Sequence, residues 1–179
     1  MSAARIDAIE GALEEARLDR RFDMVVMNQV IEHLWHPRTG LLRANALLRP
    51  AGVLSISTPN LDGYDRRLFK AHAWGGYHFP RHLNLFTTES LSRLVEECGF
   101  RPLRVVCLTA PLVWTASVHN YLTVRRWPGR RMFCDSNLLA LGLASAFDII
   151  ASRLGKITSN QQLIAQKVKE VEIDLARRD

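Results

Sequence analysis

The feature that most constrains the fold of this chain is the segment FDMVVMNQVIEHL, residues 22–34. Five of its first six residues are large and apolar, which is typical of a strand buried on both faces of a parallel sheet. Polar side chains follow at once, at Asn28, Gln29, Glu32 and His33. Open α/β sheets bind their ligands in the crevice beyond the carboxyl ends of the strands. The segment therefore predicts a buried strand over residues 22–27 that ends at a binding site.

A βαβ unit is the next prediction. Pro37 suits the first turn of a helix that runs to about Leu48 and carries an apolar stripe. Residues 49–52 (RPAG) then predict a turn, because proline and glycine end helices, and residues 53–57 are typical of a second buried strand. Strand, helix and strand in this order require a parallel sheet with a right-handed crossover. The chain is therefore predicted to be an α/β protein.

The remaining segments predict further elements around a long irregular loop. Apolar residues at helical spacing within residues 4–17 favour a short helix, mainly over residues 13–18. Residues 60–86 are rich in aromatic residues, histidine and glycine, and loops of this length in compact domains commonly serve as lids. We also expect a helical turn at residues 65–70, helices at residues 88–99, 111–124 and 137–154, and strands at residues 103–108 and 162–169.

Composition and charge exclude several classes of protein. The chain has 179 residues, of which 47% are apolar and 23% charged, as in an ordinary soluble domain with a sizeable core. Its formal charge of +6 comes with only one short basic cluster, so nucleic-acid binding is not predicted. The three cysteines are scattered, which suits a reducing compartment, and the charged N-terminus lacks the apolar run of a signal peptide. We expect a cytoplasmic protein.

Motifs in a familiar order connect the chain to a known family. After the polar-ended strand, helix and second strand of residues 22–60, residues 74–100 read WGGYHFPRHLNLFTTESLSRLVEECGF. Over roughly residues 9–170 the chain resembles class I S-adenosylmethionine-dependent methyltransferases, in the branch with a Pro-Arg-His-Leu motif. The resemblance implies a doubly wound, Rossmann-like sheet that is mostly parallel with an antiparallel last strand. It also implies S-adenosyl-L-methionine as cofactor and a small-molecule acceptor, such as a sugar, a quinone-like or a lipid-linked compound.

The resemblance also implies that the chain is a fragment, because the family's first strands, with their glycine-rich turn and ribose-binding acidic residue, have no counterpart here. Such a fragment is expected to bind the cofactor weakly or not at all, to be inactive alone, and to expose its first strand as an apolar edge open to self-association. A non-catalytic α/β fragment or interaction module is the alternative. We expect three segments: a remnant of the cofactor-binding half at residues 1–21, the C-terminal part of the methyltransferase domain at residues 22–170, and a charged tail at 171–179. Within residues 22–170 we expect a lid at 60–86 and a helical region at 111–155.

Several cofactor-binding residues follow from the same resemblance. Ala12 and Leu13 correspond to the turn that flanks the adenine, with a short strand near residues 8–10 before it. Asn28 and Gln29 correspond to positions that line the methionine part of the cofactor, with Val30 and His33 one helical step further. Some quinone O-methyltransferases carry Glu-x-x-Glu-His at this point, a candidate divalent-metal site, where this chain has a neutral amide in place of the first carboxylate. An amide weakens the binding of hard cations, so no metal is predicted.

The lid supplies the candidate catalytic residues. His82 is the first candidate for general base, because histidine ionises near neutral pH and can take the proton of an acceptor hydroxyl. His78 and His33 are further candidates, and Arg81 is expected to hold an anionic acceptor group or a nearby carboxylate. The alternative is structural: Arg81 and His82 tie the lid to the sheet, and Glu32 and His33 cap the next helix or pair with each other.

A basic turn, RRWPGRR at residues 125–131, precedes the apolar helix predicted at residues 137–154, which Asp148 is expected to break. Together they can rest on a membrane surface and admit a lipid-like acceptor. The helix is too short and too interrupted to span a bilayer. A helix that packs on the sheet beside an exposed turn is the favoured interpretation, and peripheral membrane contact is the alternative.

Overall fold

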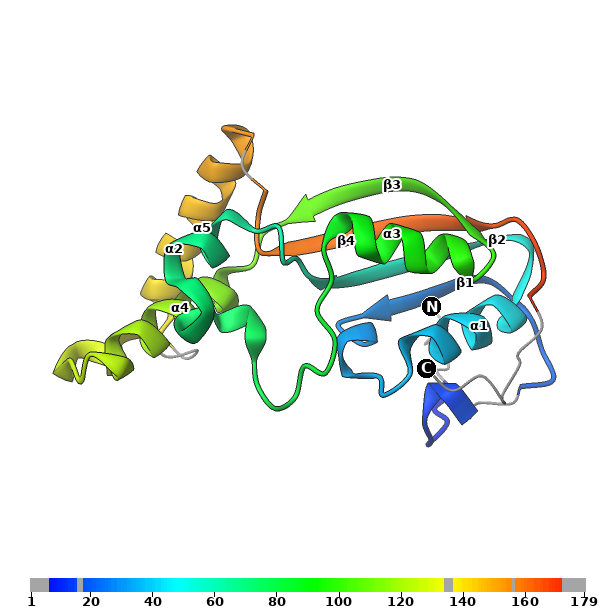
Figure 1. The fold of residues 1–179 in the computed structure, drawn as a ribbon, viewed down its shortest axis with the longest axis horizontal. Helices are drawn as coiled ribbons and strands as arrows, with labels where there is room; N and C mark the ends of the chain where they lie inside the picture. Colours follow the sequence, from blue (N-terminus) through cyan, green and yellow to red (C-terminus); the bar gives the residue numbers. More distant parts are fainter. Residues whose placement is uncertain (1–6, 16–17, 134–136, 156, 172–179) are drawn as a thin grey trace, which may run out of the picture.

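A four-stranded sheet forms the centre of the computed structural model, which describes residues 7–15, 18–133, 137–155 and 157–171 (Figure 1). β1 and β2 are parallel, and β4 runs antiparallel to both of its neighbours, β2 and β3. The predicted Rossmann-like sheet with an antiparallel last strand is confirmed. Its strands, in the spatial order β1-β2-β4-β3, are β1 (Phe22–Asn28), β2 (Leu48–Pro59), β4 (Asn160–Lys167) and β3 (Phe100–Leu108).

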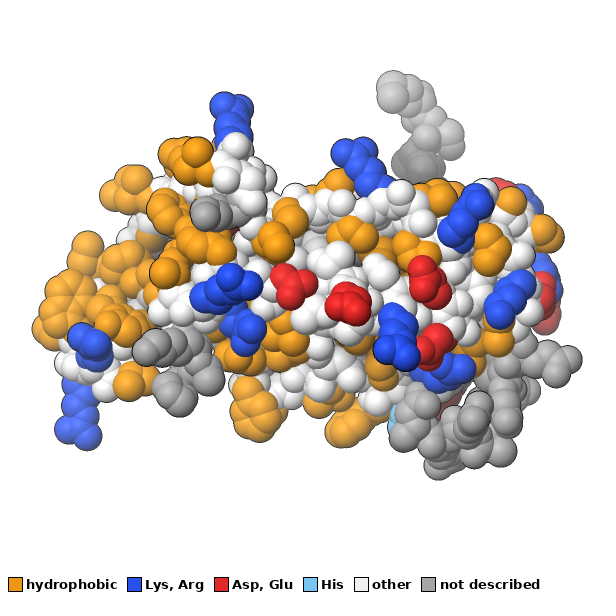
Figure 2. Space-filling view, turned by 45° about the horizontal axis from the view of Figure 1, so that its top comes forward, with side chains coloured by type: hydrophobic (Ala, Val, Ile, Leu, Met, Phe, Trp, Pro, Cys, Tyr) orange, Lys and Arg blue, Asp and Glu red, His pale blue; other side chains and the backbone are white. Residues whose placement is uncertain are grey.

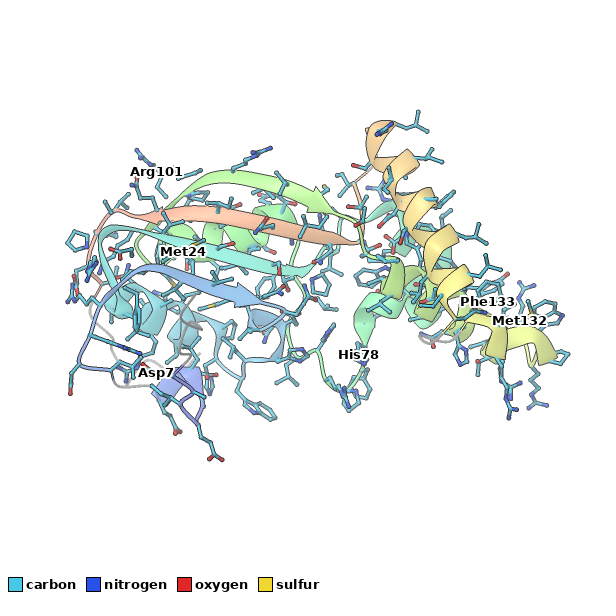
Figure 3. The ribbon with its side chains drawn as sticks, turned by 180° about the vertical axis from the view of Figure 1, so that it is seen from behind. Asp7, Met24, His78, Arg101, Met132 and Phe133 are labelled. Carbon is cyan, nitrogen blue, oxygen red and sulfur yellow. The ribbon has the colours of Figure 1, made fainter. Side chains whose placement is uncertain are left out.

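One face of the sheet is covered by α1 (Pro37–Leu47) and α3 (Thr88–Glu97), which lie on the same side in Figures 1 and 3. Thr87 caps α3 by accepting a hydrogen bond from the backbone N–H of Ser90, and Gly99 follows its end with a φ of 86°. Both helices lie where the sequence predicts them. The core between helices and strands includes Leu41, Leu42, Ala44, Leu54, Ile56, Leu91, Val95, Leu163 and Ala165.

A second group of helices lies beyond the carboxyl ends of β1 and β2 (Figure 1). The lid contains a full helix where the sequence predicts a single turn, because the Asp65 carboxylate in its first turn binds Trp74 just past its end. As predicted, a helix begins at Pro111, while the apolar helix near the C-terminus runs unbroken past Asp148. The elements of this group are α2 (Tyr64–Ala73), η3 (Gly75–Tyr77), α4 (Pro111–Val124), η4 (Pro128–Phe133) and α5 (Leu138–Arg153).

Three local predictions are wrong. Residues 49–52, predicted as a turn, belong to β2, because Leu48 already pairs with Phe22 and Ala51 adopts a left-handed φ of 60° within the strand. The described residues of the segment 13–18 show only the short turn η1 (Leu13–Glu15), and residues 8–10 form no strand. A helix this short is unstable by itself. Residues 16–17, and the tail beyond residue 171, lie outside the described residues.

β1 is an edge strand and is largely exposed. Met24 and Val26 are 52% and 60% exposed, Met27 is buried in the core at 1%, and Val25 packs against the core while partly exposed. Figure 3 shows Met24 on the sheet face opposite to α1 and α3, where no described helix lies. The position of the strand is therefore predicted correctly and its burial wrongly, while the expectation of an exposed apolar edge is confirmed.

Candidate active site

The carboxyl ends of β1 and β2 meet at a cluster of amide and hydroxyl side chains. Ser57 Oγ donates to Asn28 Oδ1, and the backbone N–H of Gln29 donates to the Ser57 carbonyl over 2.9 Å. Gln29 Nε2 donates to Asn160 Oδ1 over 3.3 Å, which brings in the first residue of β4. Gln29 has a φ of 54°, a left-handed conformation that turns the chain away from β1. Asn28 and Gln29 are both exposed, so their remaining polar groups can bind a ligand.

Glu32 is fully buried behind this cluster, in the turn η2 (Ile31–His33). Its carbonyl oxygen accepts from the N–H groups of Leu83 and Asn84 over 2.8 and 3.1 Å, which fastens the lid to the turn. Its Oε2 accepts from Thr58 Oγ1 over 3.0 Å, whereas Oε1 has no hydrogen-bond partner among the described residues. Burial raises the pKa of Glu32 above its usual range, although its hydrogen bonds oppose the shift.

His33 and His82 come together across the junction of sheet and lid, with ring centroids 4.9 Å apart. His33 Nδ1 lies 2.8 Å from the Arg81 carbonyl oxygen, and His82 Nδ1 lies 2.8 Å from that of Gly76. A carbonyl oxygen can only accept, so each Nδ1 carries the proton and each neutral ring presents Nε2 as an acceptor. Two residues predicted to move protons thus lie in one site with defined tautomers.

Of the clustered histidines, His82 is the best suited to be a base. Burial lowers the pKa of His82 below its usual value; its bond to the Gly76 carbonyl opposes this shift, and the nearby His33 and His78 add to it. The His78 ring lies 5.1 Å from that of His82. A lowered pKa keeps the His82 ring neutral at a pH where an ordinary histidine is already partly protonated. His33 and His78 are exposed, whereas His82 is half-buried.

Three side chains of this site can also hold a metal ion. One ligand atom each from Glu32, His33 and His82 lies within 4.8 Å of the other two. The set of two histidines and one carboxylate suits zinc, and the carbonyl partner of each Nδ1 is the support that metal-binding histidines commonly have. Gln29, on which the sequence prediction of no metal depends, lies outside this cluster and bonds Asn160 instead. The absence of a metal stays a prediction.

A cavity of about 850 Å³ lies between the lid and α4, a volume typical of small-molecule sites. His82 lines it, so one side chain belongs both to the cavity and to the cluster at the end of β1. Figure 3 shows two residues of the opposite walls, His78 on the lid and Phe133 on η4. No acidic side chain occurs among the described residues of the wall, which are Trp74, Gly75, Tyr77, His78, Phe79, His82, Leu85, Ala116, His119, Asn120, Thr123, Val124 and Phe133.

Other predicted site residues lie apart from this cavity. Arg81 is exposed, and its guanidinium forms no hydrogen bond or ion pair within the described part of the chain, although its carbonyl holds His33. Val30 packs against the hydrophobic core, and its apolar side chain offers a ligand no hydrogen bond. Leu13 also packs against the core, and Ala12 is exposed on a separate groove of about 450 Å³. No hydrogen bond among the described residues links Ala12 or Leu13 to the cluster at the end of β1.

Sequence reasoning missed the residues that hold the lid in position. Asp65 is fully buried and accepts hydrogen bonds from Trp74 Nε1 over 2.6 Å and from Ser159 Oγ over 2.5 Å. Burial raises the pKa of Asp65, and these bonds oppose the shift. Trp74 is thereby fixed as a wall of the cavity. Asp65 and Ser159 are separated by 94 residues, and no local pattern relates them.

Comparison with known proteins places residues 3–105 in a family described as a methyltransferase domain. A protein named as an S-adenosylmethionine-dependent methyltransferase in Mycolicibacterium smegmatis is 38% identical over 101 residues, which cover 54% of this chain and 35% of the relative. A protein of the same description in Mycobacterium tuberculosis is 31% identical over 97 residues, covering 54% of this chain and 33% of the relative. The chain thus matches about a third of the length of these relatives.

Solved structures share the fold at low sequence identity. A protein described as a methyltransferase of Bacillus halodurans aligns with a TM-score of 0.55 and 15% identity, covering 89% of this chain and 71% of that one. A protein described as an S-adenosylmethionine-dependent methyltransferase of Thermotoga maritima aligns with a TM-score of 0.53 and 18% identity, covering 90% and 63%. The [4+2]-cyclase SpnF aligns with a TM-score of 0.52 and 14% identity, covering 88% and 54%. These neighbours support the fold and leave the reaction open.

Proposed function

This chain belongs to the class I S-adenosylmethionine-dependent methyltransferases, whose cofactor is S-adenosyl-L-methionine, and we propose that it supplies the acceptor side of an active site that methylates a small molecule. The observation that carries this proposal is the position of His82. Its ring lines the 850 Å³ cavity and contacts His33 beside the polar end of β1. In open α/β sheets this edge is where ligands bind. A cofactor at the end of β1 and an acceptor in the cavity would meet at His82.

The cofactor wall in this proposal consists of Asn28 and Gln29. Both are exposed at the end of β1, and their amide groups can donate to and accept from the polar groups of the cofactor's methionine part. The bonds to Ser57 and Asn160 hold the two side chains in fixed positions before any ligand arrives. The N-terminal groove around Ala12 and Leu13 is the proposed place for the adenine.

Positioning and proton removal are the two contributions of the lid. The cofactor, when bound, supplies an activated methyl group on a sulfonium. A cavity that orients the acceptor in line with that group lowers the entropic part of the barrier. His82 Nε2 can accept the proton of an acceptor hydroxyl, since its Nδ1–H is committed to the Gly76 carbonyl. The exposed guanidinium of Arg81 is proposed to bind an anionic group of the acceptor outside the cavity.

The residues of the cavity wall limit the chemical class of the proposed acceptor. Tyr77 and Phe79 offer aromatic faces, which stack on flat or ring-shaped molecules. His119 and Asn120 add polar groups on the α4 side, and no carboxylate of the described wall would attract a cationic acceptor. A hydroxylated ring, in a quinone-like compound, a sugar or the head of a lipid-linked compound, fits this lining better than an amine.

The proposed cofactor wall is tested by titrating the ¹⁵N-labelled chain with S-adenosylhomocysteine and following backbone amides by NMR. We expect shift changes at Asn28, Gln29 and His33, with a dissociation constant weaker than about 1 mM, because two exposed amide side chains offer the ligand few contacts. Gln29→Ala should abolish the changes, whereas Gln162→Ala, an amide change on the same sheet, should not. Shift changes confined to other regions would rule out this cofactor wall, and micromolar affinity would overturn the expected weak binding.

A second candidate function, an interaction module, is favoured by the exposed edge of β1. Edge strands with apolar side chains pair with other chains unless a charge prevents it. We expect Val26→Lys to weaken self-association at least about tenfold in sedimentation velocity experiments. Leu103→Lys on the opposite edge strand β3, where the side chain is 53% exposed, is the matched control. A monomer at all concentrations, or equal effects of both changes, would exclude association through β1.

A further inference from the structure

An apolar surface gathers at the end of the molecule formed by α4, η4 and α5 (Figure 2). Of the 22 large apolar side chains that are exposed in the described residues, 13 lie between residues 111 and 157. They include Leu138, Leu139 and Leu143, which are 82%, 74% and 65% exposed. A concentration of this kind on a protein surface marks an interaction site. This surface is called the helical face below.

α5 is the main contributor to the helical face and is apolar on nearly all sides. Only Asp148 and Ala151 of its 16 residues are buried. A helix on the surface of a soluble protein normally turns one apolar stripe to the core and polar residues to water. Here Ile149 and Ile150 are 45% and 57% exposed, and Phe147, whose ring also packs against Trp114, is 47% exposed. The sequence of α5 thus suits an apolar environment on its outer side as well.

The exposed charges in the described part of the helical face have one sign. Arg125, Arg126, Arg130, Arg131 and Arg153 lie on it, and Arg125 stacks over the Tyr121 ring at 4.5 Å. Within residues 111–133, 137–155 and 157, which the structure describes, the only acidic residue is Asp148, and it is fully buried. An apolar surface with arginines at its margin matches the chemistry of an anionic lipid interface.

We infer that the helical face docks on the surface of a bilayer that contains anionic phospholipids. Charge argues against a second copy as the occupant, because a symmetric dimer through this face would bring two arginine clusters together with no exposed acidic partner among the described residues. The length of α5, about 24 Å for its 16 residues, is shorter than the hydrocarbon core of a bilayer. None of the described helices is long and apolar enough to cross a membrane, so α5 would lie along the interface.

Docking in this way would bring the cavity to the bilayer. Val124 of α4 belongs to both the helical face and the cavity wall, and η4 contributes Met132 to the face and Phe133 to the wall. An acceptor anchored in the lipid could then enter from the membrane side. This last step rests on the proposed function, whereas the docking itself depends only on the helical face.

Co-sedimentation of the full chain with vesicles tests the docking and needs no activity. At about 0.15 M salt we expect binding to vesicles with about 30 mol% phosphatidylglycerol and at least tenfold weaker binding to pure phosphatidylcholine. The double change Leu139→Glu and Leu143→Glu should reduce binding at least tenfold. Arg126→Glu with Arg131→Glu should remove the preference for anionic lipid. Leu68→Glu and Leu103→Glu, at apolar side chains 58% and 53% exposed elsewhere, are the controls.

Unchanged circular dichroism and melting temperature establish that each variant is folded. No binding by the unaltered chain, or equal losses in test and control variants, would overturn the docking. A dimer that dissociates in the Leu139→Glu, Leu143→Glu variant, without vesicle binding by the unaltered chain, would assign the helical face to a second copy and also overturn it.

Discussion

Replacing Asp148 by asparagine should lower the free energy of unfolding by about 3 kcal/mol. Asp148 is fully buried, and each of its two oxygens accepts one hydrogen bond. Oδ2 accepts from the backbone N–H of Ala110 over 2.5 Å, and Oδ1 accepts from Trp114 Nε1 over 3.0 Å. An asparagine offers one acceptor and one NH₂ group, so the NH₂ group must face a donor. Urea unfolding of both proteins measures the difference.

Asp65→Asn is the matched control, because the second buried carboxylate is bonded differently. Both of its side-chain donors, Trp74 Nε1 and Ser159 Oγ, reach the same oxygen, Oδ2. Oδ1 has no hydrogen-bond partner among the described side chains and backbone groups, so an asparagine whose oxygen takes the place of Oδ2 keeps both hydrogen bonds. We expect a change of less than about 1 kcal/mol. Losses of equal size in the two variants would contradict this reading of the two sites.

The stability of the Asp65→Asn variant should depend on pH differently from that of the unaltered chain, because the pKa of Asp65 is raised. A buried carboxylate with a folded-state pKa above its unfolded value binds its proton more tightly when folded. Its contribution to stability is therefore greatest in acid and is lost as the pH rises from the ordinary carboxyl range through the folded-state pKa. Asp65→Asn removes this loss. The variant should gain stability relative to the unaltered chain between acidic and neutral pH.

Asp148 also illustrates where sequence reasoning reached its limit. In the sequence it is a charge that interrupts an apolar helix, and this pattern predicted a break. In the structure the Asp148 carboxylate accepts two hydrogen bonds from the start of α4. It therefore fastens α5 to α4 and does not end the helix. The partners, Ala110 and Trp114, are more than one element away. A pattern within one helix carries no information on such partners.

Elements with local signals were predictable. Pro37 marks the start of α1, Thr87 and Gly99 mark the two ends of α3, and Pro111 starts α4, and each signal acts within a few residues. The order of the strands is different, since β4 pairs between β2 and β3 through contacts over the length of the chain. The resemblance to a family, not the periodicity, supplied the antiparallel last strand.

The candidate site was predictable in its members and not in its geometry. Asn28, Gln29, His33 and His82 could be singled out as polar residues after a strand or in a lid. Their assembly depends on backbone carbonyls, at Arg81 and Gly76, that are the same in every amino acid and leave no trace in the sequence. The link from Gln29 to Asn160 and the grouping of Glu32 with two histidines are equally non-local.

His82 is the residue whose replacement should have the largest effect on methyl transfer. If it removes the proton of an acceptor hydroxyl, His82→Ala should lower kcat about 10²- to 10⁴-fold, the usual contribution of general acid–base catalysis. The measurement requires an active enzyme, either this chain or this chain joined to a cofactor-binding half. His78→Ala is the matched control, because His78 lines the same cavity and its exposed ring contacts that of His82.

The pH profile separates a base from a residue that only shapes the cavity. Since burial lowers the pKa of His82, the folded chain loses the basic form only below pH 6.5, the value of an unperturbed histidine. The acid limb of kcat/KM should therefore lie below that pH and disappear in His82→Ala. A variant with raised KM, unchanged kcat and the same acid limb would show that His82 only positions the acceptor. Proton removal by a second group, His33, would instead leave the acid limb in His82→Ala and eliminate it in His33→Ala.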